Sequence, residues 1–197
     1  GSPKLSLNEI MEGLSLQRIT YLLALSKTKS TKDLLPAAMM YIYLHGRPKS
    51  MSVPPNGIPH TKEKETSNGI FLNDPDVLRT LDSQSGTDDG FIGVSYVKDG
   101  SVKKTSPVLT AEQFEALKAL TEKILIRLYS RLESGEIAIH PVKNGTLSPC
   151  SYCPYRSICR FDPALPENSF DYISKVSDKT IREKLDEEMK RNGKENL

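Results

Sequence analysis

The sequence has no apolar run of the roughly 18 residues that a membrane-spanning helix needs, and no signal-peptide pattern at its start. It has only three cysteines, an odd number, and all lie between positions 150 and 159. This usage argues against a secreted disulfide scaffold, so we expect a reducing cytoplasm and no membrane association. The phosphate-binding pattern G-x-x-x-x-G-K-[ST] is also missing, which predicts that the chain does not itself carry that kind of ATP site.

The rest of the composition is that of an ordinary globular protein. Of the 197 residues, 37% are hydrophobic and 26% are charged, which predicts one core with appendages. A net charge of +2 gives little indication of nucleic-acid binding. Residues 1–4, "GSPK", resemble the scar left by tag cleavage, and helical sequence follows at once, so we expect a piece of a larger protein.

The hydrophobic pattern predicts an α/β fold in which helices flank a sheet. Asn8 is a candidate N-cap for a first helix whose one face carries Ile10, Leu14, Gln17 and Tyr21. Residues 37–45, "AAMMYIYLH", are apolar on both faces, as in a strand covered on both sides. Residues 46–69 are rich in proline, glycine and charge, and we expect a long loop there.

Further elements follow along the second half of the sequence. Asp74 and Pro75 predict a short helix to about Leu81, and Asp99-Gly100 predicts a hairpin turn. Thr110 and Gln113 form a capping-box pattern before a long helix that Gly135 would end, with a buried stripe of Phe114, Leu117, Ile124, Leu128 and Leu132. "EIAIHP" predicts a short strand, and 166–197 predicts a tail too polar for the core.

The three cysteines have the spacing C-x2-C-x5-C, as Cys150, Cys153 and Cys159. Thiolates are soft ligands that suit iron–sulfur clusters or zinc. A four-iron cluster normally takes four protein thiolates, so one would have to come from elsewhere. Zinc completed by a histidine such as His140 is an alternative, and three thiols without metal are another. The spacing does not choose between the metals.

Four residues around the cysteines have two interpretations each. Tyr152 and Tyr155 would shield a cluster from water or simply pack, and Arg156 and Arg160 would contact DNA phosphates or simply be solvated.

Two separated stretches resemble the C-terminal nuclease domain of the AddB family, the B subunits of AddAB-type ATP-dependent helicase–nucleases of bacteria. They are "GLSLQRITYLLAL" near the start and "GEIAIHPVKNGTLSPCSYCPYRSICRFDP" near the end, and the resemblance spans about residues 5–165. It implies part of a RecB-like nuclease core of the PD-(D/E)XK superfamily, which hydrolyses DNA with Mg²⁺. It also implies an A subunit as partner, double-stranded DNA ends as substrate, and a role in recombinational repair.

The resemblance assigns roles to particular residues. Gln17 and Tyr21 match the glutamine and tyrosine of the family's pattern and are expected to be accessory catalytic residues. Cys150, Cys153 and Cys159 match the last three ligands of the family's 4Fe–4S cluster, whose first cysteine lies far upstream.

The sequence departs from the family pattern before Gln17. The family's catalytic aspartate and (D/E)-x-Lys motif precede the glutamine, and no such motif is found there; Glu63, Lys64 and Glu65 in the charged loop are interpreted as solvated. We therefore expect the chain alone to be an inactive fragment that lacks the N-terminal catalytic strands and binds little or no cluster. A zinc-stabilised nucleic-acid-binding module and a CRISPR-associated iron–sulfur nuclease are the alternative hypotheses.

Overall fold

The computed structural model describes residues 5–31, 34–42, 67–87, 90–146, 148–166 and 168–195. The expected tag scar at 1–4 and nearly all of the expected loop at 46–69 lie outside this part of the chain. Residues 67–69 are described and are not loop: Ser67 forms a β-bridge with Ile92, and Asn68 begins a strand. Among the described residues, no helix combines the length and apolar character required to cross a membrane.

A three-stranded sheet lies at the centre of the fold. Strand β1 (Ala38–Tyr41) pairs antiparallel with β2 (Asn68–Leu72), and β2 pairs parallel with β3 (Val108–Leu109). Gly69 is needed in β2 because a Cβ there would lie 2.7 Å from the Met39 carbonyl oxygen. The described part of the 37–45 strand is therefore confirmed at 38–41.

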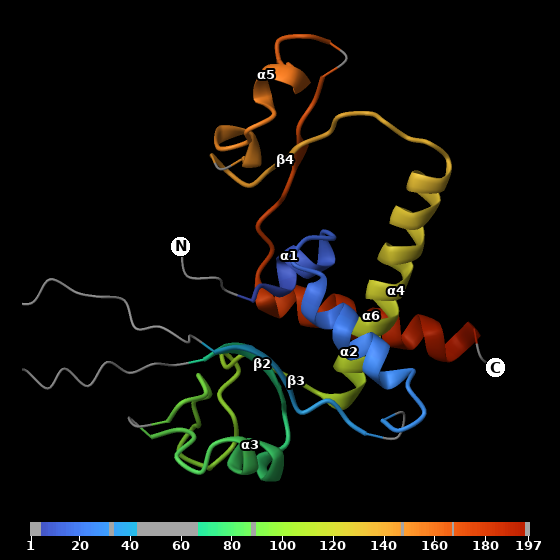
Figure 1. Ribbon diagram of the computed structural model, residues 1–197. Coiled ribbons are helices and arrows are strands. Elements are labelled where there is room, and N and C mark those ends of the chain that lie inside the picture. The colour runs from blue at the N-terminus through green and yellow to red at the C-terminus, as the bar shows by residue number, and fades with distance from the viewer. Residues whose placement is uncertain are drawn as a thin grey trace, which may run out of the picture.

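The two faces of the sheet bury different cores, as the apolar pattern of the first strand predicted. Met39, Ile70 and Leu109 pack against helices on one face. Phe71 and Val108 point to the other face and pack with Leu78, Ile92 and Val94. Figure 1 shows helices α1, α2, α4 and α6 grouped on one side of the sheet and α3 on the other.

The predicted first helix is in fact two helices, α1 (Leu7–Met11) and α2 (Gln17–Ser26). Gly13 and Ser15 adopt left-handed backbone angles, with φ of 81° and 51°, and so end α1. The N-cap is Ser6 rather than Asn8, whose side chain donates instead to the Ser174 carbonyl at 3.0 Å. The break separates residues expected on one face: Ile10 is buried, whereas Gln17 is exposed.

The middle of the chain follows its predicted signals. Helix α3 (Pro75–Leu81) has Asp74 as its N-cap, and the Asp99-Gly100 turn is closed by a bridge between Tyr96 and Val102. Helix α4 (Ala111–Glu133) begins with the complete capping box and is followed by Gly135 at a φ of 72°.

The expected buried stripe of α4 is correct only in its first half. Phe114, Leu117 and Ile124 are buried, Leu128 is half-buried and Leu132 is 77% exposed. The end of α4 extends beyond the sheet and its neighbouring helices (Figure 1), which agrees with the exposure of Leu132.

The cysteine segment, defined as residues 134–177, leaves the body after α4 and returns before the last helix. It contains β4 (Val142–Lys143), the 3-10 turn η1 (Pro149–Ser151), α5 (Arg156–Cys159) and β5 (Asp171–Tyr172), with β4 and β5 paired in parallel. The strand expected at 136–141 is wrong, because those residues pair with no strand in the described part of the chain; the strand begins at Val142, and Ile137 is 90% exposed.

The predicted polar tail contains helix α6 (Asp178–Glu195), which belongs to the main core. Ile181 and Leu185 are each 1% exposed, and Met189 packs beside them. These three residues recur every four positions, so they form one narrow apolar face on a helix that is otherwise charged. Average polarity concealed this face, and the expectation that the tail lies outside the core was wrong.

Polar contacts hold α6 in place around this apolar face. Gln113 of α4 donates to the Asp186 carboxylate at 2.8 Å, and Lys123 pairs with Glu188. The hydrogen bond from Lys123 holds the pKa of the Glu188 carboxyl below its ordinary value. Arg182 donates to the carbonyls of Lys104 and Ser106 at 2.7 and 2.8 Å, which joins α6 to the hairpin.

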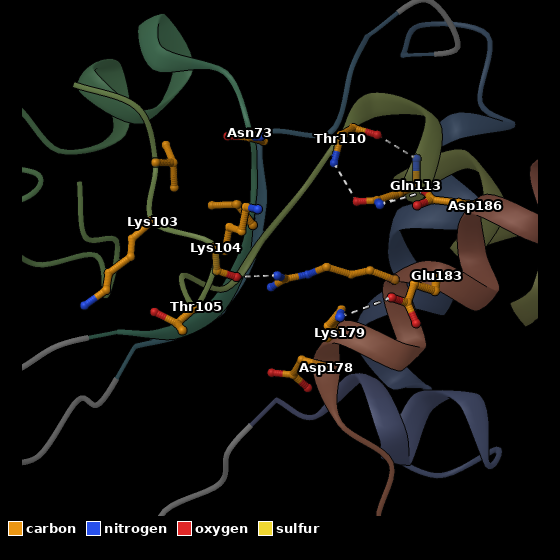
Figure 2. A pocket seen from close by; sticks show the side chains of 13 residues that line it. Asn73, Lys103, Lys104, Thr105, Thr110, Gln113, Asp178, Lys179, Glu183 and Asp186 are labelled. Carbon is orange, nitrogen blue, oxygen red and sulfur yellow. Dashed lines mark hydrogen bonds and ion pairs between the residues drawn. The ribbon is translucent and has the colours of Figure 1, made fainter. Parts of the chain in front are cut away.

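A cavity of about 610 Å³ lies between α6, the start of α4 and the hairpin. Figure 2 shows Gln113 reaching Asp186 and Lys179 reaching Glu183 along its wall. The charged residues that line it are of both signs in nearly equal number: Lys103, Lys104, Lys179, Arg182, Asp178, Glu183 and Asp186. The charges around this cavity therefore favour neither an anionic nor a cationic ligand.

Replacing Leu185 by alanine tests the position of α6. We expect Leu185→Ala to lower the free energy of unfolding by about 2–5 kcal/mol, because it opens a cavity in the main core. The exposed neighbour Lys184 provides the matched control, and Lys184→Ala should change it by about 0.5 kcal/mol or less. Urea unfolding of both variants measures the difference, and equal values would show that α6 is not docked.

Candidate functional site

The three cysteines come together at one cavity in the cysteine segment. Cys150 lies in η1, Cys153 follows it, and Cys159 is the last residue of α5. All three line a cavity of about 360 Å³. The Ser148 hydroxyl caps η1 by accepting from the Cys150 amide at 3.3 Å, which orients the first cysteine. The first two are half-buried and Cys159 is exposed.

Aromatic rings form another wall of this cavity. Phe161 and Phe170 line it and meet edge to face, with centroids 4.9 Å apart. The Lys143 ammonium lies 4.9 Å from the centroid of Phe170 and 5.8 Å from that of Tyr172, within the range of a cation–π contact. These contacts connect β4 and β5 to the turn that carries the cysteines.

The surroundings of the thiols favour an anionic group. Lys143 and Arg156 both line the cavity, and no aspartate or glutamate occurs between Glu136 and Asp162. Glu136 itself is paired, since Arg131 donates two hydrogen bonds to it, and these hold the pKa of the Glu136 carboxyl below its usual value. A cluster with several thiolate ligands is negative, and this environment suits it.

The donor set fits a soft metal group only in part. Three thiols share one cavity, which suits thiolate-ligated iron or zinc. Within the described part of the chain, however, no set of three or more His, Cys, Asp and Glu side chains is placed to hold a metal ion. His140 does not line the cavity; its Nδ1 lies 3.2 Å from the Ser169 hydroxyl, so the Cys3His alternative is not supported.

The cysteine segment has no apolar core of its own. No described residue from 125 to 180 is buried, although Ile124 before it and Ile181 after it are. Small units of this kind are usually stabilised by disulfides or metals, because they bury too little apolar surface. The three cysteines are free, so no disulfide among them supplies a cross-link.

The aromatic and basic neighbours of the cysteines face solvent. Tyr152 is 80% and Tyr155 67% exposed, so in this structure they neither pack nor shield the thiols. Arg156 and Arg160 are exposed as well, which leaves them accessible to phosphates. Arg160 caps α5 in a left-handed conformation, with φ of 52°, which costs a non-glycine residue roughly 1 kcal/mol.

Gln17 and Tyr21 lie on α2, in the main body and away from the cysteine segment (Figure 1). The Gln17 amide donates to the Tyr21 hydroxyl at 2.9 Å, so the predicted pair is in contact. Both side chains are exposed. Between them in sequence, the Arg18 guanidinium lies over the ring of Tyr41, which anchors α2 to the edge strand β1, and burial lowers the Arg18 pKa.

Sequence reasoning missed Lys143 and Phe170 at the cysteine cavity. Phe170 lies in the part of the chain that was interpreted as tail. The only sequence signal for Lys143 was that no acidic residue lies near it in the stretch around the cysteines.

Comparison with known proteins gives the family. The sequence model of the PD-(D/E)XK nuclease superfamily matches residues 1–160. The chain therefore belongs to the PD-(D/E)XK nuclease superfamily, and the mixed α/β fold agrees with that assignment.

Three similar relatives are named as B subunits of an ATP-dependent helicase/deoxyribonuclease. The chain is 32% identical to the B subunit from Desulforamulus reducens over 92% of its length, and 33% identical to that from Clostridium kluyveri over 92%. It is 31% identical to that from Bacillus subtilis over 93%. The matched region is 16% of each of these relatives. The chain thus corresponds to a nuclease-domain segment of such a protein, as the family resemblance predicted.

Proposed function

We propose that the protein containing this chain is the B subunit of a bacterial ATP-dependent helicase–nuclease, active in the cytoplasm. Together with an A subunit it degrades linear duplex DNA from its ends in preparation for recombinational repair. The observation that carries this proposal is the cysteine triplet around one cavity, in a chain that resembles such subunits along more than nine-tenths of its length. ATP binding belongs to other parts of that protein.

In this proposal, Cys150, Cys153 and Cys159 hold a 4Fe–4S cluster. The fourth thiolate comes from outside this sequence, which contains three cysteines. Zinc draws its sulfur ligands to about 2.3 Å, whereas a four-iron cluster spreads them around a larger cage. The three thiols that line one cavity, with Lys143 and Arg156 beside them, support the cluster. Bound there, the cluster supplies a cross-link, and the residues around it provide positive charge and an aromatic wall.

DNA cleavage in this proposal depends on Mg²⁺ held by carboxylates outside this sequence. When bound, the metal activates a water and offsets charge on the scissile phosphate. Gln17 has an accessory role: its amide orients a ligand at the edge of the sheet and is itself oriented by Tyr21. The 2.9 Å hydrogen bond between the two side chains, and the anchoring of α2 on β1 through Arg18, support that role.

The first experiment uses the complete polypeptide encoded by the gene, co-purified with its A subunit under anaerobic conditions. We expect Mg²⁺- and ATP-dependent degradation of linear duplex DNA, together with about four irons per complex. Cys150→Ser should lose most of the iron, because it removes one ligand. Ser157→Ala, at an exposed position of α5 that does not line the cavity, is the matched control and should keep both iron and activity.

Two outcomes would contradict this proposal. Absence of DNA degradation by the complete complex would refute the nuclease function. Stoichiometric zinc in place of iron would refute the cluster and favour a zinc-stabilised module.

The 197-residue chain alone is expected to be inactive and nearly free of iron, because it lacks the catalytic carboxylates and a fourth thiolate. Incubation with linear duplex DNA and Mg²⁺, and iron analysis of the purified chain, check both statements. Degradation that persists after repeated purification would show that the catalytic groups lie within this sequence.

Replacing Gln17 tests its accessory role in the complete complex. We expect Gln17→Ala to lower kcat for DNA cleavage by about 10- to 100-fold, the effect of losing one hydrogen bond in the transition state. The unfolding midpoint should be unchanged, because Gln17 is exposed. Gln84→Ala replaces an exposed glutamine after α3 and should leave kcat as it is. A kcat equal to wild type in Gln17→Ala would remove this residue from the mechanism.

A further inference from the structure

The half-buried guanidinium of Arg18 has no anionic partner in the described part of the chain. It lies over the ring of Tyr41, and it makes no ion pair and no hydrogen bond with a described residue. Arg182, which is also half-buried, instead donates to two backbone carbonyls. Burial lowers the pKa of the Arg18 guanidinium, since desolvation disfavours its charged form. A partly desolvated cation of this kind is stabilised when an anion binds beside it.

The contact with Tyr41 leaves the hydrogen-bonding edge of the Arg18 guanidinium free. The ring covers one face of the guanidinium, whereas the N–H donors point outward in the plane of the group. This planar fork of donors matches the oxygens of a phosphate. The contact joins the start of α2 to the last residue of β1, which is an edge strand of the sheet in the described part of the chain.

Arg18 is also a neighbour of the pair that the proposed function places beside the cleaved DNA. Gln17 precedes it on α2, and Tyr21, which accepts the hydrogen bond from Gln17, follows three residues later on the neighbouring turn of the helix. Gln17 and Tyr21 are both exposed, and neither side chain carries the negative charge that Arg18 lacks. A DNA strand bound beside this pair brings phosphates, which carry that charge.

We infer that Arg18 is a further DNA-binding residue of the nuclease site, and that its guanidinium, oriented by the ring of Tyr41, donates to a phosphate near the one that is cleaved. Contacts to phosphates fix the position of a strand and not its sequence, so Arg18 sets where the strand lies relative to Gln17. This inference rests on the proposed function, which places cleavage beside α2, and it adds the residue that holds the strand there.

The test maps where the complete polypeptide, in complex with its A subunit, cuts linear duplex DNA in which single phosphates are replaced by neutral methylphosphonates. We expect wild type to cut about tenfold less often at one fixed distance from the neutral linkage, because a charge-assisted hydrogen bond from Arg18 is lost there. Arg18→Ala should lose this depletion and keep those that arise from other contacts. Its rate of cleavage on ordinary DNA should fall by about tenfold.

Two control variants separate phosphate binding from other effects of substitution. Tyr41→Phe keeps the ring that orients the guanidinium, so it should reproduce the rate and the cutting pattern of wild type. Arg127→Ala removes an exposed arginine of α4 that has no polar partner among the described residues, and it should do the same.

An identical pattern of depletion in wild type and Arg18→Ala would overturn the inference. Slower cutting by Arg18→Ala with an unchanged pattern would show that Arg18 only anchors α2 or pairs with a carboxylate elsewhere in the polypeptide. In both cases wild type still degrades DNA, so the proposed function stands. A wild-type complex that degrades no DNA would instead refute the proposed function and this inference together.

Discussion

The packing of α6 against α4 is the interaction on which the rest of this structure depends. The cysteine segment leaves the body at the end of α4 and returns at the start of α6, so these two helices hold both of its ends. Ile181 and Leu185 provide the apolar contact. The Gln113–Asp186 hydrogen bond and the Lys123–Glu188 ion pair join the two helices beside it. Asn8 adds a third attachment, because its side chain binds the carbonyl of Ser174 just before α6.

The cysteine segment contrasts with the body that holds it. The body has two cores, one on each face of the sheet, whereas none of the segment's described residues is buried. Its structure is supported by one short parallel strand pair, the edge-to-face contact between Phe161 and Phe170, and the cation–π contact of Lys143 with Phe170. A metal group that joined the three thiols would supply the cross-link that a core of this size does not.

The two groups of predicted site residues lie on elements that differ in how they are packed. Gln17 and Tyr21 are on a helix packed on the main core and anchored to β1, which is suitable for positioning a group precisely. Tyr152, Tyr155 and the two arginines are exposed on a short turn outside any core. In the described part of the chain, β1 and β3 are the edge strands of the sheet, and an edge has unpaired backbone groups to which further strands can add.

Local chemistry determined several features from sequence alone, and only the tertiary structure decided those that depend on distant residues. The capping box at Thr110, the Asp74 cap and the Asp99-Gly100 turn depend on neighbours within three residues, so their sequence signals sufficed. The cysteine spacing likewise placed three thiols near one another. By contrast, the three apolar residues of α6 were too few to identify a core helix until α1 and α4 were seen to bury them. The strand expected at 136–141 had the right composition, but among the described residues no strand pairs with it. Burial and strand pairing depend on what lies opposite a residue, and a single sequence does not contain that information.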